Sequence, residues 1–141
     1  MHAASSFDYA VIRVVPRVEL EEFVNAGVIV FCLQRRFLEV RTQCDEGRWR
    51  ALWPELDVER VRRQVEAFER VARGDPEAGP VARLSQRERF HWMVAPRNTM
   101  VQTSPVHTGI SDEPERVVGE LLARMVPGKV AAESRASGRS A

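Results

Sequence analysis

The segment RNTMVQTSPVHTG (Arg97–Gly109) carries side chains that could do chemistry. After its first residue it has twelve positions without Lys, Arg, Asp or Glu, in a chain in which 29% of the residues are charged. Ser104 and His107 lie three positions apart and could act as a nucleophile and its general base. A carboxylate of Asp112 or Glu113 could orient the imidazole. These residue types are sufficient for acyl or phosphoryl transfer, with the arginine that opens the segment binding the anion.

The residues around Ser104 also have a structural explanation. The local string is T-S-P-V rather than G-x-S-x-G, so no nucleophile elbow surrounds the hydroxyl. Ser, Thr and Asn side chains satisfy backbone groups where a chain enters or leaves a sheet. In this alternative, residues 103–108 form a turn around Ser104 and Pro105, and His107 donates to a carbonyl. Catalysis therefore requires Ser104 and His107 to approach hydrogen-bonding distance beside an open pocket, and no catalytic residue is assigned.

A third interpretation is recognition of a peptide or protein partner. Aromatic and Arg side chains are the usual anchors of such surfaces. The side chains that could line a groove are Trp92, His91, Arg97 and His107. The string RFHWM, which contains two of them, has an alternative explanation in which Phe90 and either Trp92 or Met93 pack inward and His91 stays outside.

Cofactor and metal motifs are missing from the sequence. It contains no G-x-x-x-x-G-K-[ST] and no G-x-G-x-x-G after a predicted strand, so the familiar nucleotide cradles are absent. It has neither H-E-x-x-H nor a Cys/His spacing typical of zinc. Cys32 and Cys44 are too few for a disulfide framework and lie outside any CxxC spacing. We therefore expect no cofactor and no metal.

Length and charge limit the class of protein. A chain of 141 residues is the size of one domain. Its 21 basic and 20 acidic residues are evenly mixed, whereas a nucleic-acid binder needs a concentrated positive field, so this composition argues against nucleic acid. The longest apolar run, Ala26–Leu33, is too short to span a bilayer. The N-terminal residues show no secretory signal. We therefore expect a cytoplasmic protein without a membrane association.

The first half of the chain is predicted to consist mainly of strands. β-branched and aromatic residues predict strands at Phe7–Pro16, Val28–Leu33 and Phe37–Gln43, the last two joined as an antiparallel hairpin. Between the first two, Arg17–Gly27 is typical of a short helical turn that ends in a glycine. Arg48–Trp53 is interpreted as a further short strand.

The second half is mainly helical. The predicted helices are Leu56–Pro76, Leu84–Pro96 and Ser111–Gly128. Their predicted N-terminal caps are Asp57, the pair Ser85 and Glu88, and the pair Asp112 and Glu115. On the solvent face of the first helix, Glu59 is expected to pair with Arg63. A short strand is predicted at Thr99–Thr103.

Strands followed by helices and one late strand predict an α+β fold. We expect a small antiparallel sheet of three to five strands packed against two main helices plus short helical turns. The predicted organisation is a disordered N-terminus at residues 1–6, one α+β domain at residues 7–128 and a disordered tail at residues 129–141, which is poor in large apolar groups.

Two blocks of sequence resemble a known family. They are DYAVIRVVPRVELEEFVNAGVIVFC (Asp8–Cys32) and ERFHWMVAPRNTMVQTSPVHTG (Glu88–Gly109). Their distinctive parts are EEFVNAGVIVF, here called the first signature string, and PRNTMVQTSPVHTG, the second. Both are similar to the bacterial family of unknown function DUF3037, over about Phe7 to Val126. The resemblance implies no established activity. It marks Glu22, Asn25, Gly27, Arg97, Gln102, Ser104, Pro105, His107 and Gly109 as residues of the signature strings.

Family members are often encoded near HipA-like kinases, so the resemblance puts such a kinase among the partners to consider. Our leading hypothesis is a small accessory or protein-interaction module whose signature loop and first helical turn form a polar recognition surface. The alternative is a small hydrolase or transferase that uses Ser104 and His107. The residues expected to bind a partner are Glu22, Asn25, Arg97, Gln102, Ser104, His107, His91 and Trp92.

Overall fold

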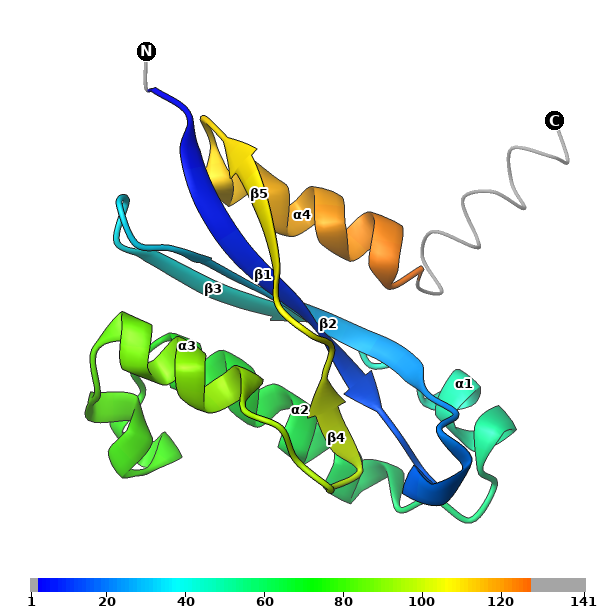
Figure 1. Cartoon of the computed structure of the whole chain (residues 1–141). Helices are drawn as coiled ribbons and strands as arrows, with labels where there is room; N and C mark the ends of the chain where they lie inside the picture. The colour runs from blue at the N-terminus through cyan, green and yellow to red at the C-terminus, as the bar shows by residue number, and fades with distance from the viewer. Residues whose placement is uncertain (1–2, 128–141) are drawn as a thin grey trace, which may run out of the picture.

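A computed structural model describes residues 3–127 as five strands, four α-helices and three short 3-10 turns (Figure 1). The strands are β1 (Ser5–Val14), β2 (Val24–Cys32), β3 (Phe37–Thr42), β4 (Val101–Thr103) and β5 (His107–Ser111). The helices are α1 (Glu46–Leu52), α2 (Val58–Ala72), α3 (Gln86–Val94) and α4 (Pro114–Met125). The 3-10 turns are η1 (Val18–Leu20), η2 (Pro76–Ala78) and η3 (Pro80–Arg83). The predicted α+β class and antiparallel sheet are confirmed.

The sheet is organised around β1, which has neighbours along both of its edges. The strand order is β3-β2-β1-β4, and every pairing is antiparallel. The second edge of β1 is shared: β4 pairs with Ile12–Val14, and β5 pairs with Ser5–Tyr9. Figure 1 shows β4 and β5 following one another along β1. The second signature string therefore forms one edge of the sheet in two pieces.

Helices cover both faces of this sheet (Figure 1). Because side chains alternate along a strand, neighbouring residues of β2 enter different cores. Ile29 packs in the larger core with residues of α1, α2 and α3, whereas Val28 and Val30 pack against α4. This double coverage explains why β2 is almost continuously apolar. The side of the sheet that carries α4 is called the α4 face below, and the other side the α2 face.

Several predicted boundaries were wrong. The N-terminal residues 5 and 6, predicted to be disordered, belong to β1, because they pair with β5. The helical turn predicted for Arg17–Gly27 is limited to η1, and β2 begins at Val24 rather than Val28. Strand β5 was not predicted at all, since a polar string acquires strand geometry here only by pairing with β1. The tail predicted at residues 129–141 lies outside the described residues.

The strand predicted at Arg48–Trp53 is instead part of helix α1. The side chain of Asp45 accepts a hydrogen bond from the backbone N–H of Arg48, which starts the helix. Its anchor in the larger core is Trp49, which is completely buried. Helix α1 is therefore fixed by a cap and one buried ring, neither of which gives a strong periodic pattern.

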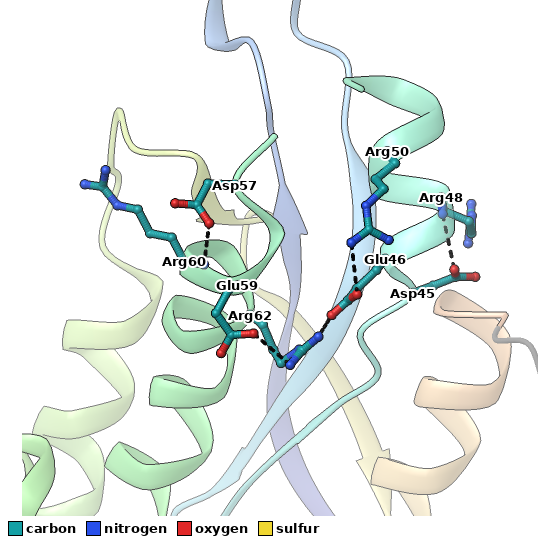
Figure 2. A network of polar contacts seen from close by, with 8 residues as sticks. All are labelled: Asp45, Glu46, Arg48, Arg50, Asp57, Glu59, Arg60 and Arg62. Atoms are coloured by element: carbon teal, nitrogen blue, oxygen red, sulfur yellow. Dashed lines mark hydrogen bonds and ion pairs between the residues drawn. The ribbon is translucent and has the colours of Figure 1, made fainter. Parts of the chain in front are cut away.

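Ion pairs connect α1 to α2 (Figure 2). Glu46 of α1 pairs with Arg62 of α2, and Arg62 also contacts Glu59 at 2.9 Å. The pair expected between Glu59 and Arg63 is thus replaced by one at the i,i+3 spacing. Glu46 in addition lies 3.5 Å from Arg50 of its own helix. The network bridges two helices that are adjacent in sequence.

The helix caps were predicted with mixed success. Asp57 accepts from the N–H of Arg60 and Ser85 from that of Glu88, which confirms the first two caps. The capping box predicted from Asp112 was wrong. Helix α4 follows Glu113, which makes no side-chain cap, and begins with a buried proline.

Gly27 allows β2 and β3 to approach closely. A Cβ atom at this position would lie 2.9 Å from the backbone carbonyl oxygen of Arg41 and 3.1 Å from the Cα of Thr42. Backbone atoms of paired strands cannot move away without disturbing the pairing. The glycine of the first signature string is therefore required by packing.

We expect Gly27→Ala to lower the free energy of unfolding by about 1–3 kcal/mol, because the added methyl group overpacks this contact. The matched control is Gly47→Ala in α1, where a Cβ would lie 3.4 Å from the nearest atom, Asp45 Oδ1. Alanine there should be neutral or raise stability by up to about 1 kcal/mol. Urea unfolding followed by circular dichroism measures both variants. Equal stabilities of the two would contradict the packing role.

Candidate functional site

The two signature strings meet at β1, one on each of its edges. The first leads into β2, and the second forms β4 and β5. Side chains near β4 alternate between the two faces of the sheet. Asn98 and Gln102 line a pocket on the α4 face, while Arg97 and Val101 line a groove on the α2 face. One short segment thus contributes to two separate concavities.

The pocket on the α4 face is called the Arg13 pocket. It has a volume of about 360 Å³ and is lined by Arg13, Val15, Val18, Glu21, Phe23, Asn98 and Gln102. Val18 comes from η1 and Glu21 directly follows it, in the left-handed conformation with φ 55°. Residues from the first helical turn and from the signature loop therefore line the same pocket.

A row of polar side chains crosses three strands at Arg13. Asn25 of β2 and Gln102 of β4 are the register partners of Arg13 on its two sides. A register shift in the β1–β2 pairing, between Ile12 and Arg13, places Asn25 opposite Arg13. The outer amides are held in place by backbone carbonyls: Asn25 donates to Met125 at 3.0 Å, and Gln102 donates to the carbonyl of Thr99 at 2.8 Å.

Arg13 is the charged group in this row, and among residues 3–127 no carboxylate lies within ion-pair distance of it, although Glu21 lines the same pocket. Its guanidinium carbon lies 4.1 Å from the centre of the Phe23 ring, a cation–π contact that orients the side chain. Its Nε is buried without a hydrogen-bond partner, and so is Oδ1 of the neighbouring Asn25. A guanidinium has five N–H donors, so the group can bind an anion without giving up an internal contact.

Ser104 has a structural role in the gap between β4 and β5. Its side chain is only 4% exposed. The hydroxyl accepts a hydrogen bond from the N–H of Val11 at 2.9 Å and donates one to the carbonyl of Pro105 at 2.9 Å. The backbone N–H of Ser104 in turn bonds to the Val11 carbonyl at 2.8 Å. The side chain therefore completes the pairing of β1 where neither edge strand reaches it.

His107 is exposed at the start of β5, opposite Tyr9. The two ring centres are 5.3 Å apart. Among residues 3–127 there is no hydrogen bond between His107 and Ser104, nor between His107 and Asp112 or Glu113. This geometry supports a structural role for Ser104 over the catalytic one. The expected donation from His107 to a carbonyl is not found among residues 3–127.

The remaining predicted binding residues lie in other places. Trp92 and Arg97 line the groove on the α2 face, called the Trp92 groove below. His91 is exposed beside it on α3, and the buried residues of that string are Phe90 and Met93. Glu22 lines a smaller pocket of about 220 Å³. The predicted binding residues therefore do not form one site, and only Asn25 and Gln102 among them adjoin Arg13.

Of the residues that line the Arg13 pocket, only Gln102 was among the predicted binding residues. Those missed include Arg13 itself, Phe23 and Asn98. The available signal was a charge inside the strand predicted at Phe7–Pro16, because a charged residue in an otherwise apolar strand needs an explanation. Phe23 and Asn98 lie inside the signature strings, but their side chains could not be placed without the register of the sheet.

Other chemistries find little support in residues 3–127. No cluster of three His, Cys, Asp or Glu side chains there could hold a metal ion. No helix in that range combines the length and apolar character of a membrane span. Cys32 is buried. Burial, with a smaller contribution from Glu66, raises the pKa of the Cys44 thiol from 9.0 to about 11, which keeps it protonated at neutral pH.

A family model described as a protein of unknown function, DUF3037, matches residues 9–126. The chain belongs to the DUF3037 family. Comparisons with curated proteins and with solved structures gave no match. The resemblance noted in the sequence is thereby confirmed. Because the match includes both signature strings, the Arg13 pocket lies within the part of the chain that defines membership of DUF3037.

We expect Ser104→Ala to lower the free energy of unfolding by about 1–3 kcal/mol, because it leaves the buried N–H of Val11 without an acceptor. The matched control is Thr108→Ala, which removes an exposed hydroxyl bonded to Asp8 and should cost less than about 0.5 kcal/mol. Thermal unfolding gives the stabilities, and hydrogen exchange of the Val11 amide reports on the local bond. Unchanged exchange at Val11 would contradict this role of Ser104.

The raised pKa of Cys44 predicts slow alkylation. Only the thiolate reacts, and its fraction at pH 8 is about 100-fold smaller for a pKa of about 11 than for one of 9.0. Iodoacetamide should therefore modify Cys44 about 100-fold more slowly in the folded protein than in urea. The rate should rise about tenfold per pH unit from pH 8 to 10. Peptide mass spectrometry assigns the modified residue, and equal rates in folded and unfolded protein would refute the shift.

Proposed function

We propose that this member of DUF3037 is a small cytoplasmic interaction module that binds an acidic side chain of a protein partner in the Arg13 pocket. The observation that carries the proposal is the unpaired Arg13 guanidinium in a pocket built by both signature strings. A half-buried cation with no carboxylate at ion-pair distance favours an anionic ligand. Phe23 holds one face of the guanidinium, so its orientation is set before the ligand arrives.

The surroundings of the pocket favour a protein ligand over a small ion. Three large apolar side chains are exposed within six residues: Val18 at 37%, Leu20 at 48% and Phe23 at 45%. Exposed apolar residues that gather in this way are typical of protein-contact surfaces. The pocket also presents the amides of Asn98 and Gln102, of which the Gln102 oxygen remains able to accept.

The partner segment that fits these features has a carboxylate next to an apolar residue. Its carboxylate would bind the guanidinium of Arg13, and its backbone N–H could donate to the Gln102 side chain. The apolar neighbour would pack on Val18 and Phe23. A HipA-like kinase, which the family resemblance puts forward, is the first purified protein to test for such a segment.

We expect Arg13→Gln to reduce the capture of the specific partner from a lysate of the source cells at least tenfold, the loss of one charge-assisted hydrogen bond. Gln102→Ala should weaken capture of the same protein. The immobilised full chain is used, and quantitative mass spectrometry compares the captured proteins. The matched control is Arg60→Gln, since Arg60 is exposed on α2 and points away from the neighbouring ion pairs (Figure 2).

A captured protein supports the proposal only if its binding depends on the Arg13 pocket. The protein identified by mass spectrometry is therefore purified, and its affinity for the wild type and the three variants is measured by calorimetry. Raising the salt concentration should weaken binding, because screening reduces the attraction of a partly exposed charge pair. A partner bound equally well by the wild type and Arg13→Gln would refute the proposed role of the pocket.

A further inference from the structure

The Trp92 groove is a second concavity, separated from the Arg13 pocket by β4. It has a volume of about 270 Å³ and lies between α2, α3 and the start of β4. The lining residues that matter here are Ala67, Phe68, Trp92, Arg97, Thr99 and Val101. Apart from Arg97 no lining residue is charged, and most of the walls are apolar. A groove of this kind accommodates an apolar group together with one anionic group.

Arg97 lies in this groove between two aromatic rings. Its guanidinium carbon is 4.5 Å from the centre of the Trp92 ring and 5.2 Å from that of the Phe68 ring. One terminal nitrogen donates to the Trp92 carbonyl at 2.7 Å. Within residues 3–127 this is its one hydrogen bond, and no acidic side chain is within ion-pair distance. The remaining N–H donors are therefore free to bind a ligand.

Burial lowers the pKa of Arg97, which means that its surroundings disfavour the charged form. An anion in the groove would compensate this cost. The two rings already contact the guanidinium, so they do not form a free cage for a cationic ligand. A phosphate would need further cations and more polar walls than the groove offers.

From these observations we infer that the Trp92 groove binds a small monocarboxylate with an apolar body. The carboxylate is bound by Arg97, and the body lies against Phe68, Ala67 and Val101. A cavity of about 150 Å³ lined by apolar side chains is large enough for benzene, so the groove can hold one ring and its carboxylate. This inference is independent of the proposed function, because the two sites lie on opposite faces of the sheet.

Phenylacetate is the probe that tests the inference. The full chain is titrated with it, and ¹H–¹⁵N spectra follow the indole N–H of Trp92 together with the backbone amides of the groove. We expect saturable shifts confined to the groove, with a dissociation constant on the order of 1 mM, as is usual for a ligand of this size. Phenylacetamide, which has the same shape without the charge, should bind at least tenfold more weakly. Inorganic phosphate should give no saturable shift in the groove.

Variants separate the two parts of the site. Arg97→Gln should weaken phenylacetate binding at least tenfold. Phenylacetate and phenylacetamide should then bind this variant with the same low affinity. Ala67→Leu should also prevent binding, because the larger side chain fills the groove without touching the charge. Arg87→Gln is the matched control, as Arg87 is exposed on the same helix as Trp92 and outside the groove.

Three results would overturn the inference. They are the absence of a saturable shift with phenylacetate, equal binding of phenylacetate and phenylacetamide to the wild type, and an unchanged affinity in Arg97→Gln. Since neither Arg13 nor Gln102 lines this groove, a negative result here would not contradict the function proposed for the Arg13 pocket. Conversely, loss of partner capture by Arg13→Gln would not affect the titration.

Discussion

The rest of the structure depends on the hydrogen bonding of β1. This strand lies inside the sheet, so the N–H and C=O groups on both of its edges must find partners. One edge is satisfied continuously by β2. The other is satisfied by two short strands and, in the gap between them, by the main chain and hydroxyl of Ser104. The polar side chain of Ser104 follows from this task, since its hydroxyl replaces a missing backbone partner.

The same arrangement explains why two concavities adjoin one short edge. Alternation along β4 sends Gln102 to the α4 face and Val101 to the α2 face. Arg13 and Arg97 then occupy comparable positions in their pockets, each with its guanidinium against an aromatic ring and without an acidic partner among the described residues. Positioning a cation by a ring leaves its N–H donors unused, which an ion pair would not do.

The sequence predicted those elements whose cause is local. The stripe of Val61, Val65 and Phe68 and the Asp57 cap are enough to specify α2. Helix α1 and strand β5 could not be predicted, because they depend on distant partners: α1 on the core around Trp49 and the pair between Glu46 and Arg62, and β5 on its pairing with β1. In both cases a tertiary contact overrides a weak local preference.

The candidate site was predicted only in part, for a similar reason. Family resemblance directed attention to Asn25 and Gln102, which do flank Arg13 in the sheet. Arg13 could not be connected to them without the register of three strands, including its shift after Ile12. The position of Glu22 could not be predicted from the sequence either. The left-handed residue after η1 puts Glu21 in the Arg13 pocket, while Glu22 lines another.

The division of one sheet edge into β4 and β5 has a consequence for crowded solutions. An exposed, uninterrupted strand edge is a template on which a second molecule can add its own strand, the first step towards fibres. Here the outer edge offers a stretch of three residues and one of five, separated by Pro105, which has no N–H to offer. The gap between β4 and β5, which Ser104 fills on the side facing β1, therefore disfavours strand addition along the exposed edge.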